Sequence, residues 1–202
     1  MLEEERCLLA RIINVFVVSF LTTSCAIIST VGSLAGSAST STRGFSGTIE
    51  DTYLMSKIVS KITLMRLSNF SNITVSVING KVLLAGNIKS QEKRLELIQK
   101  VWQIQGVEAI FNEVEIGPQI PLSEKAEDFI FEAKIVNRLL FEPGIFSNNY
   151  SVDVVNGNVY IMGISSDIEE KTKLENFVGN MNDIKKLILL VDIQKTNNKN
   201  GR

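Results

Sequence analysis

The residues that most often carry out chemistry near neutral pH are scarce in this sequence. It contains no histidine and two cysteines, Cys7 and Cys25, among 202 residues. Histidine is the usual proton carrier and metal ligand, so most hydrolytic and zinc chemistries lack their usual groups. Neighbouring carboxylates such as Asp167 and Glu169 have no histidine, cysteine or phosphate loop near them in sequence. We therefore expect no enzymatic activity, no cofactor and no metal.

Cys25 follows a segment that is typical of an export signal. Residues 12–21 form an apolar run that comes after Arg11 and ends at small polar residues. The run is shorter than the roughly 20 apolar residues that a membrane-spanning helix needs. We therefore expect residues 1–24 to be a signal peptide.

The stretch Leu21-Thr22-Thr23-Ser24-Cys25 resembles the lipobox of bacterial lipoproteins, although Thr22 stands where that motif usually has an apolar residue. The resemblance implies that Cys25 is the lipid attachment site. With Ala26 next, it also implies delivery to the periplasmic face of the outer membrane. The alternative is that Cys25 is an incidental thiol near a processing site.

The sequence after Cys25 changes character. Residues up to about 48 are rich in Ser, Thr and Gly and carry almost no charge, which is typical of a flexible tether. The whole chain has a net charge of −1. Bulk charge therefore gives no attraction to nucleic acid, and no nucleic-acid partner is expected.

The second half of the sequence repeats the first. Gly80 and Gly157 lie 77 residues apart, and the same offset holds without a gap from Asp51 to Ile116. Two copies of about 70 residues favour tandem domains, because a solenoid usually needs three or more units. The predicted organisation is a signal peptide (1–24), a lipidated cysteine and linker (25–48), a first domain (49–117), a linker (118–122), a second domain (123–194) and a disordered tail (195–202).

The first element of each copy is predicted to be a helix. Leu54, Ile58 and Ile62 recur every four residues, which places them on one helical face. We expect this helix to span residues 51–65. The counterparts of its apolar residues in the second copy are Phe131, Ile135 and Leu139.

A β-hairpin is predicted next. Residues 73–77 alternate between apolar and polar, and residues 81–85 form a second apolar strand. The Asn-Gly pair between them accepts the positive φ angles of a type I′ turn. The structural turn residues of the two copies are Asn79, Gly80, Gly86, Asn156, Gly157 and Gly163.

A second helix and a last strand complete each copy. Ser90, or Asp167 in the second copy, can cap a helix that runs to about residue 103, and residues 109–116 form the strand. The order α-β-β-α-β predicts an α+β fold, with a three-stranded mixed sheet covered by two helices in each domain. We expect the apolar residues of the second helix to be core and its charged clusters (91–94 and 169–171) to face solvent. Those apolar residues are Leu95, Ile98, Val101 and Trp102.

Both copies share the pattern Val-x-Val-x-Asn-Gly-x-Val-x-x-x-Gly, followed by a capped helix. In this pattern they resemble the BON domain, and the whole chain is similar to dual-BON outer-membrane lipoproteins. The second copy departs from the family at Asp183-Ile184, where Gly-Val is usual, so a different turn is expected there. The resemblance implies a non-catalytic envelope protein that is associated with phospholipid, supports outer-membrane integrity, and works beside the barrel assembly machinery.

The differences between the copies suggest where binding occurs. The first helix of the second copy has apolar residues where the first copy has polar ones, for example Leu140 in place of Thr63. Its cations could meet lipid phosphates while the apolar side chains enter the membrane. The resemblance also places lipid contact on this helix. The predicted anionic-phospholipid contact residues are Phe129, Ile130, Lys134, Arg138, Leu140 and Phe141.

Several alternatives remain open at the level of sequence. The apolar residues of this helix could instead pack against the first domain or bind a protein partner. The chain could be a soluble periplasmic protein with a stress or chaperone-like role and no lipid. It could also be a ring-forming component of a secretion channel, because domains of the same element order build such rings.

Overall fold

The computed structural model describes residues 44–64 and 72–194, with side chains from residue 47 onward. The predictions for the signal peptide, for Cys25, for most of the tether and for the C-terminal tail lie outside these residues. Both repeated modules belong to one compact unit of the chain.

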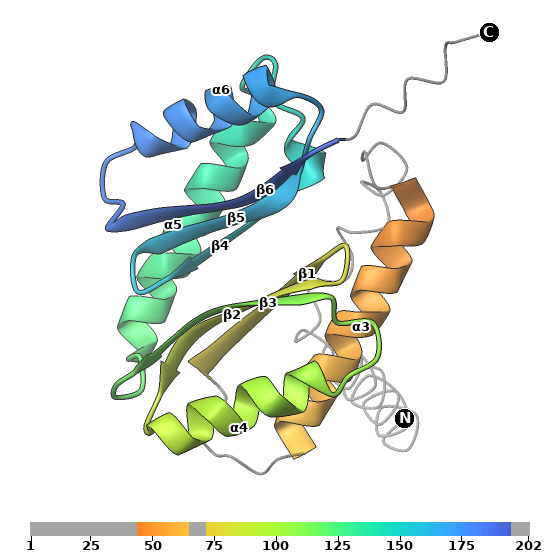
Figure 1. Ribbon diagram of the computed structural model, residues 1–202. Helices are drawn as coiled ribbons and strands as arrows, with labels where there is room; N and C mark the ends of the chain where they lie inside the picture. The colour runs from red at the N-terminus through yellow and green to blue at the C-terminus, as the bar shows by residue number, and fades with distance from the viewer. Residues whose placement is uncertain (1–43, 65–71, 195–202) are drawn as a thin grey trace, which may run out of the picture. The chain divides into compact units, whose positions relative to one another are not determined.

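The first module has the predicted order of elements (Figure 1). Its strands form a sheet in the order β1-β2-β3, with β1 antiparallel and β3 parallel to the central β2. The mixed sheet predicted from sequence is therefore confirmed. Its elements are α3 (Gly44–Leu64), β1 (Ile73–Ile78), β2 (Lys81–Ile88), α4 (Gln91–Trp102) and β3 (Ala109–Ile116).

The second module repeats this architecture. Its sheet has the order β4-β5-β6, again with one antiparallel and one parallel pairing. A short 3-10 helix, η2, comes directly before β4. The elements are α5 (Leu122–Leu140), η2 (Ser147–Asn149), β4 (Tyr150–Val155), β5 (Asn158–Ser165), α6 (Ile168–Gly179) and β6 (Lys186–Ile193).

The two hairpin turns have the predicted conformation. Asn79 and Gly80 have φ angles of 50° and 70°, and Asn156 and Gly157 have 55° and 72°. Positive φ at both central residues is the requirement of a type I′ turn. The strands also keep one register, because Ile73 pairs with Gly86 in one module as Tyr150 pairs with Gly163 in the other.

The glycine that ends each hairpin pattern is needed for close packing. A Cβ on Gly86 would collide with the backbone carbonyl of Asn72, and a Cβ on Gly163 would collide with that of Asn149. Because the obstacle is backbone in both cases, a larger residue could not be accommodated by a change of side-chain rotamer. This explains why the glycine recurs at the repeat distance.

Two helices cover one face of each sheet. Leu54, Ile58 and Ile62 of α3 are buried together with Leu97 and Val101 of α4 against the first sheet. In the second module Ile135 and Leu139 of α5 meet residues of α6 in the same way, with Phe131 packed beside them. The apolar spacing of the first helix in each module therefore predicted its buried face correctly.

The opposite faces of the two sheets share a third apolar cluster. It contains the same positions from each copy: Ile78 and Val155, Leu83 and Tyr160, Ala85 and Met162. Ion pairs between Lys81 and Asp192 and between Lys186 and Glu113 also join residues of the two modules. Both faces of each sheet are thus buried, one by helices and one by the other module.

Two expectations about the start of a helix and about core positions were wrong. Helix α3 begins at Gly44, before the predicted start at residue 51 and inside the predicted linker. Trp102 is 51% exposed and Leu95 is also exposed, because the buried stripe of α4 runs through Leu97 and Val101 instead. Trp102 lies about 100° around the helix from Val101, which turns it away from the sheet.

The turn before the last strand is alike in the two modules, contrary to expectation. Asp183 has a φ of 78°, in the same left-handed region as Gly106 with a φ of 104°. The hydrogen bond that follows is also equivalent: Glu108 donates to the Gly80 carbonyl and Lys185 to the Gly157 carbonyl. Asp183 therefore adopts a backbone conformation that costs a residue with a Cβ roughly 1 kcal/mol.

Candidate functional site

The predicted lipid-contact residues lie on the outer side of α5, with Leu140 and Phe141 at its C-terminal end. Phe129 is 69% exposed, Ile130 67%, Leu140 55% and Phe141 79%. Large apolar side chains with this exposure usually mark a contact surface when they lie on one element. We call the six residues Phe129, Ile130, Lys134, Arg138, Leu140 and Phe141 the outer face of α5.

Most of the outer face lies away from the first module. The core side of α5 is formed by Ile135 and Leu139. The two modules meet mainly through their sheets, at the cluster around Leu83 and Tyr160. Phe129 lines a groove with the start of β1 but remains 69% exposed. The exposure of all four apolar residues contradicts the alternative that they are buried against the first module.

Both cations of the outer face are exposed and held over aromatic rings. The Lys134 ammonium lies 5.8 Å from the centre of the Phe131 ring, and the Arg138 guanidinium lies 5.5 Å from that of Phe177. These contacts orient the two charges beside the apolar stripe, without neutralising either of them. The arrangement places positive charge along one border of an apolar surface.

The structure extends this apolar surface beyond the predicted residues. Leu122 and Val136 are exposed on α5 at spacings of seven and four residues, which keep them in line with Phe129 and Leu140. Phe146, in the loop that follows α5, is exposed as well. The heptad-like spacing of Leu122, Phe129 and Val136 was readable in the sequence. The exposure of Phe146 was not.

The corresponding face of the first module is more polar. Tyr53 and Lys57 occupy the positions of Ile130 and Lys134, and the Lys57 ammonium lies 4.2 Å from the centre of the Tyr53 ring. Thr52 and Thr63 stand in place of Phe129 and Leu140, and the Thr63 hydroxyl donates to the Val59 carbonyl. The two helices share a fold and differ in their outer chemistry.

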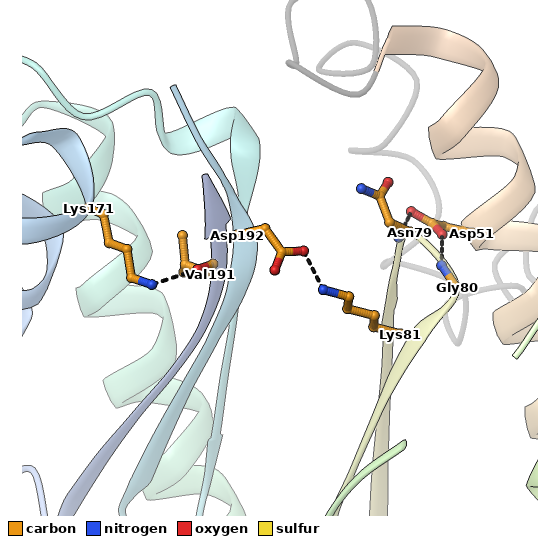
Figure 2. Close-up of polar contacts among 7 residues, drawn as sticks. All are labelled: Asp51, Asn79, Gly80, Lys81, Lys171, Val191 and Asp192. Atoms are coloured by element: carbon orange, nitrogen blue, oxygen red, sulfur yellow. Dashed lines mark hydrogen bonds and ion pairs between the residues drawn. The ribbon is translucent and has the colours of Figure 1, made fainter. Parts of the chain in front are cut away.

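A carboxylate holds each hairpin turn against the first helix of its module. Asp51 accepts hydrogen bonds from the backbone N–H groups of Asn79, at 2.9 Å, and Gly80, at 3.2 Å (Figure 2). Asp128 does the same for Asn156 and Gly157, at 2.8 Å each. The sequence analysis missed this role, although an aspartate that recurs at the repeat distance was a usable signal.

Glu170 is a buried anchor, contrary to the expectation that its cluster faces solvent. Its carboxylate accepts hydrogen bonds from the backbone N–H groups of Phe146 and Ser166, both at 2.8 Å. The equivalent position in the first module is Lys93, which pairs with Glu96 at the surface. Glu170 thus ties α6 to the loop that carries Phe146. The neighbouring Lys171 donates to the Val191 carbonyl (Figure 2). Arg94 donates to the Val114 carbonyl in the same way.

Two carboxyl groups lie close together on the inner side of α5 and on β4. Burial, the largest cause, and the negative charges of Asp153 and Asp128 together raise the pKa of Glu132 to about 7, against a hydrogen bond from the Val154 N–H that lowers it. Burial also raises the pKa of Asp153, which a hydrogen bond from Ser76 opposes. Glu132 is therefore poised to change its protonation state near neutral pH.

The described residues offer little for other chemistries. No three carboxylate or cysteine side chains within residues 44–64 and 72–194 converge in a way that could hold a metal ion. Over the same residues, no helix combines the length and the apolar character that crossing a membrane requires.

Comparison with known proteins agrees with the architecture. The BON domain family matches residues 50–118 and 127–194, which are the two modules. The chain is 33% identical over 147 residues to an uncharacterized protein in the gshII 5′ region of Anaplasma centrale. That match covers 72% of this chain and 96% of the relative.

Two solved structures also resemble the chain, both of CdsD, a structural protein of the type III secretion system of Chlamydia trachomatis. One, its C-terminal domain, is 19% identical with a TM-score of 0.27; the match covers 69% of this chain and 64% of that one. The other is 13% identical with a TM-score of 0.28, covering 68% and 92%. With two matched domains over most of its described length and a relative of 33% identity, this chain belongs to the BON domain family.

Proposed function

We propose that this protein binds anionic phospholipid membranes through the outer face of α5 and acts as a non-catalytic component of the bacterial envelope. The observation that carries the proposal is the exposure of Phe129, Ile130, Leu140 and Phe141 beside Lys134 and Arg138. An interfacial helix gains from apolar side chains in the acyl region and from cations near lipid phosphates. Each cation near an anionic surface contributes about 1 kcal/mol.

The anchoring of the protein is part of the same proposal. A diacylglyceryl group on Cys25 would hold the two modules at the periplasmic face of the outer membrane, and α5 would supply a second contact. Two acyl chains already give stable anchoring, so the contact through α5 would orient the modules on the membrane surface. In this position the protein supports outer-membrane integrity, and outer-membrane assembly proteins are the partners we expect. Mass spectrometry of the mature N-terminus tests the anchor, since a free terminus at another residue contradicts it.

A vesicle flotation experiment tests the contact surface. The full chain with Cys25→Ser is compared with the same chain carrying Ile130→Asp, on vesicles with and without anionic lipid. We expect Ile130→Asp to weaken binding at least tenfold, because it removes an apolar contact of about 1–2 kcal/mol and adds a repelled charge. Residues 1–43 are common to both chains, so their contribution cancels in the comparison.

The repeat offers matched controls. Tyr53→Asp changes the equivalent exposed position of the first module, and we expect it to leave flotation unchanged. The pair Lys134→Glu and Lys57→Glu tests the charge in the same way, with loss expected for Lys134→Glu alone. If Tyr53→Asp and Ile130→Asp have equal effects, or if flotation does not depend on anionic lipid, the proposal is wrong.

A further inference from the structure

A groove with a volume of about 230 Å³ lies beside the outer face of α5. One wall is formed by the start of β1 with Asn72, which comes directly before it. The other walls come from α5 and from the end of β4. Phe129 belongs both to this lining and to the outer face of α5, so the groove is continuous with the proposed membrane-contact surface.

Asn72 provides an unused hydrogen-bond donor in the lining of this groove. Asn72 is 7% exposed, and its Nδ2 atom is itself buried and has no hydrogen-bond partner among the described residues. A buried amide without a partner is unfavourable, because it has lost its hydrogen bonds to water without replacing them. Since buried polar groups are nearly always satisfied, an unsatisfied one that lines a groove indicates a missing acceptor.

The rest of the polar lining comes from α5 and carries charges of both signs. Lys125 supplies a cation, whereas Glu132 and Asp128 supply carboxylates. Both oxygens of Asp128 already accept from the hairpin turn, and Glu132 accepts one weaker bond, at 3.3 Å from the Val154 N–H. Glu132 therefore has acceptor capacity left for a ligand.

This lining suits a small ligand that carries both a phosphate and an ammonium group. We propose that the groove binds the headgroup of an aminophospholipid, with the phosphate accepting from Asn72 Nδ2 and Lys125 Nζ and the ammonium donating to Glu132. The inference rests on the proposed membrane function, because Phe129 would bring the lipid surface to the entrance of the groove. A headgroup with phosphate and no ammonium would leave Glu132 uncompensated.

The first helix of the first module lacks two of the groups that α5 supplies to this site. Thr48 stands in place of Lys125 and Met55 in place of Glu132. Met55 packs against the core of its module. The lysine and the glutamate of the groove are therefore found on α5 alone, which also carries the apolar outer face.

The experiment uses glycerophosphoethanolamine as a soluble probe, with glycerophosphocholine and glycerophosphoglycerol for comparison. In nuclear magnetic resonance spectra of the full chain, we expect glycerophosphoethanolamine to shift the side-chain amide signals of Asn72. The other two probes should bind at least tenfold more weakly, since neither offers an ammonium with N–H donors to Glu132. Equal binding of all three probes, or no shift at Asn72, overturns the proposal.

Two variants test the assigned contacts. Asn72→Leu removes the donor directly before β1, a position where a substitution can disturb the sheet. The fold of this variant is therefore checked by its melting temperature and its amide spectrum. Lys125→Gln changes a less buried helical position and serves as the second variant. Both should lower affinity for the probe at least fivefold, whereas Glu124→Gln, on the exposed start of the same helix, should not. Wild-type affinity in both Asn72→Leu and Lys125→Gln overturns the site.

The outcomes separate this inference from the function on which it rests. If flotation depends on Ile130 and on anionic lipid while the probe does not bind, the groove proposal fails and the membrane proposal stands. If the probe binds while the Ile130→Asp variant floats normally, the membrane proposal fails. The groove would then bind a soluble ligand, so its assignment to a lipid headgroup fails as well. Vesicles with and without phosphatidylethanolamine, at a constant fraction of anionic lipid, give the direct test, and we expect tighter binding with it.

Discussion

Ser76 donates a hydrogen bond to Asp153 over 2.6 Å, and the two residues occupy the same position in the two copies, 77 residues apart. Equivalent positions of the two modules therefore meet where the sheets face each other. The shared apolar cluster agrees, since equivalent residues from each sheet contribute to it. At this contact the two copies differ chemically, because a hydroxyl faces a carboxylate.

Asp153→Asn should lower the pKa of Glu132. Burial is the main reason that this pKa stands at about 7, and the charge of Asp153 is the next. The amide oxygen of asparagine can still accept from Ser76, so the contact survives while the charge is removed. A carboxyl-carbon titration by nuclear magnetic resonance should show the Glu132 midpoint closer to its ordinary value of 4.5. An unchanged midpoint would mean that the two carboxyl groups do not interact.

Glu132→Met should make the protein more stable above neutral pH. The folded-state pKa of Glu132, about 7, lies above the ordinary value of 4.5, so the folded chain binds more protons than the unfolded chain between these limits. Stability therefore falls as pH rises through that window. Methionine, as at Met55, removes this penalty. Allowing for partial solvation, we expect about 1–2 kcal/mol at pH 8 and little change at pH 4 in urea unfolding. A gain of equal size at both values contradicts the assignment.

Glu170→Ala should destabilise the second module by about 2–4 kcal/mol. The substitution leaves the backbone N–H groups of Phe146 and Ser166 without their carboxylate acceptor. Hydrogen exchange should also quicken at Phe146, in the loop that Glu170 holds. The matched control is Lys93→Ala, whose surface pair with Glu96 should contribute no more than about 0.5 kcal/mol. Similar losses for the two variants would show that Glu170 is not an anchor.

Asp183→Gly should stabilise the protein by about 0.5–1 kcal/mol. The residue has a φ of 78°, where glycine is free of the steric cost that a Cβ carries. The converse change, Gly106→Ala, should cost about 1–2 kcal/mol, because Gly106 has a φ of 104° although space for a Cβ exists. Thermal melting of both variants is the measurement. A loss of stability in Asp183→Gly would indicate that the aspartate side chain compensates for the strain.

Local patterns in the sequence predicted the strands and turns best. The Asn-Gly pairs and the alternation before them placed both hairpins, and the last strand was found at residues 109–116 as predicted. These features depend on neighbouring residues alone, so they can be read without knowledge of the fold. The outer face of α5 was also readable, because the first copy shows which positions the fold needs to be apolar.

Features that depend on distant contacts were missed. Glu170 lies in a charged cluster that resembles a surface face, and nothing nearby in sequence shows that the Phe146 N–H will meet it. The contact between the sheets had a signal that was not used. Residues 82–85 and 159–162 are apolar without interruption, whereas the strands of a sheet with one solvent-exposed face alternate between apolar and polar residues. The burial of both faces of β2 and β5 follows from that pattern.

The cluster between the sheets constrains the two modules unequally. The sheets carry equivalent apolar patches, centred on Leu83 in one and Tyr160 in the other, and each patch is buried by the other. A change of side-chain volume in one patch therefore requires a matching change in the other. The outer faces of α3 and α5 carry no such requirement, and they differ in chemistry.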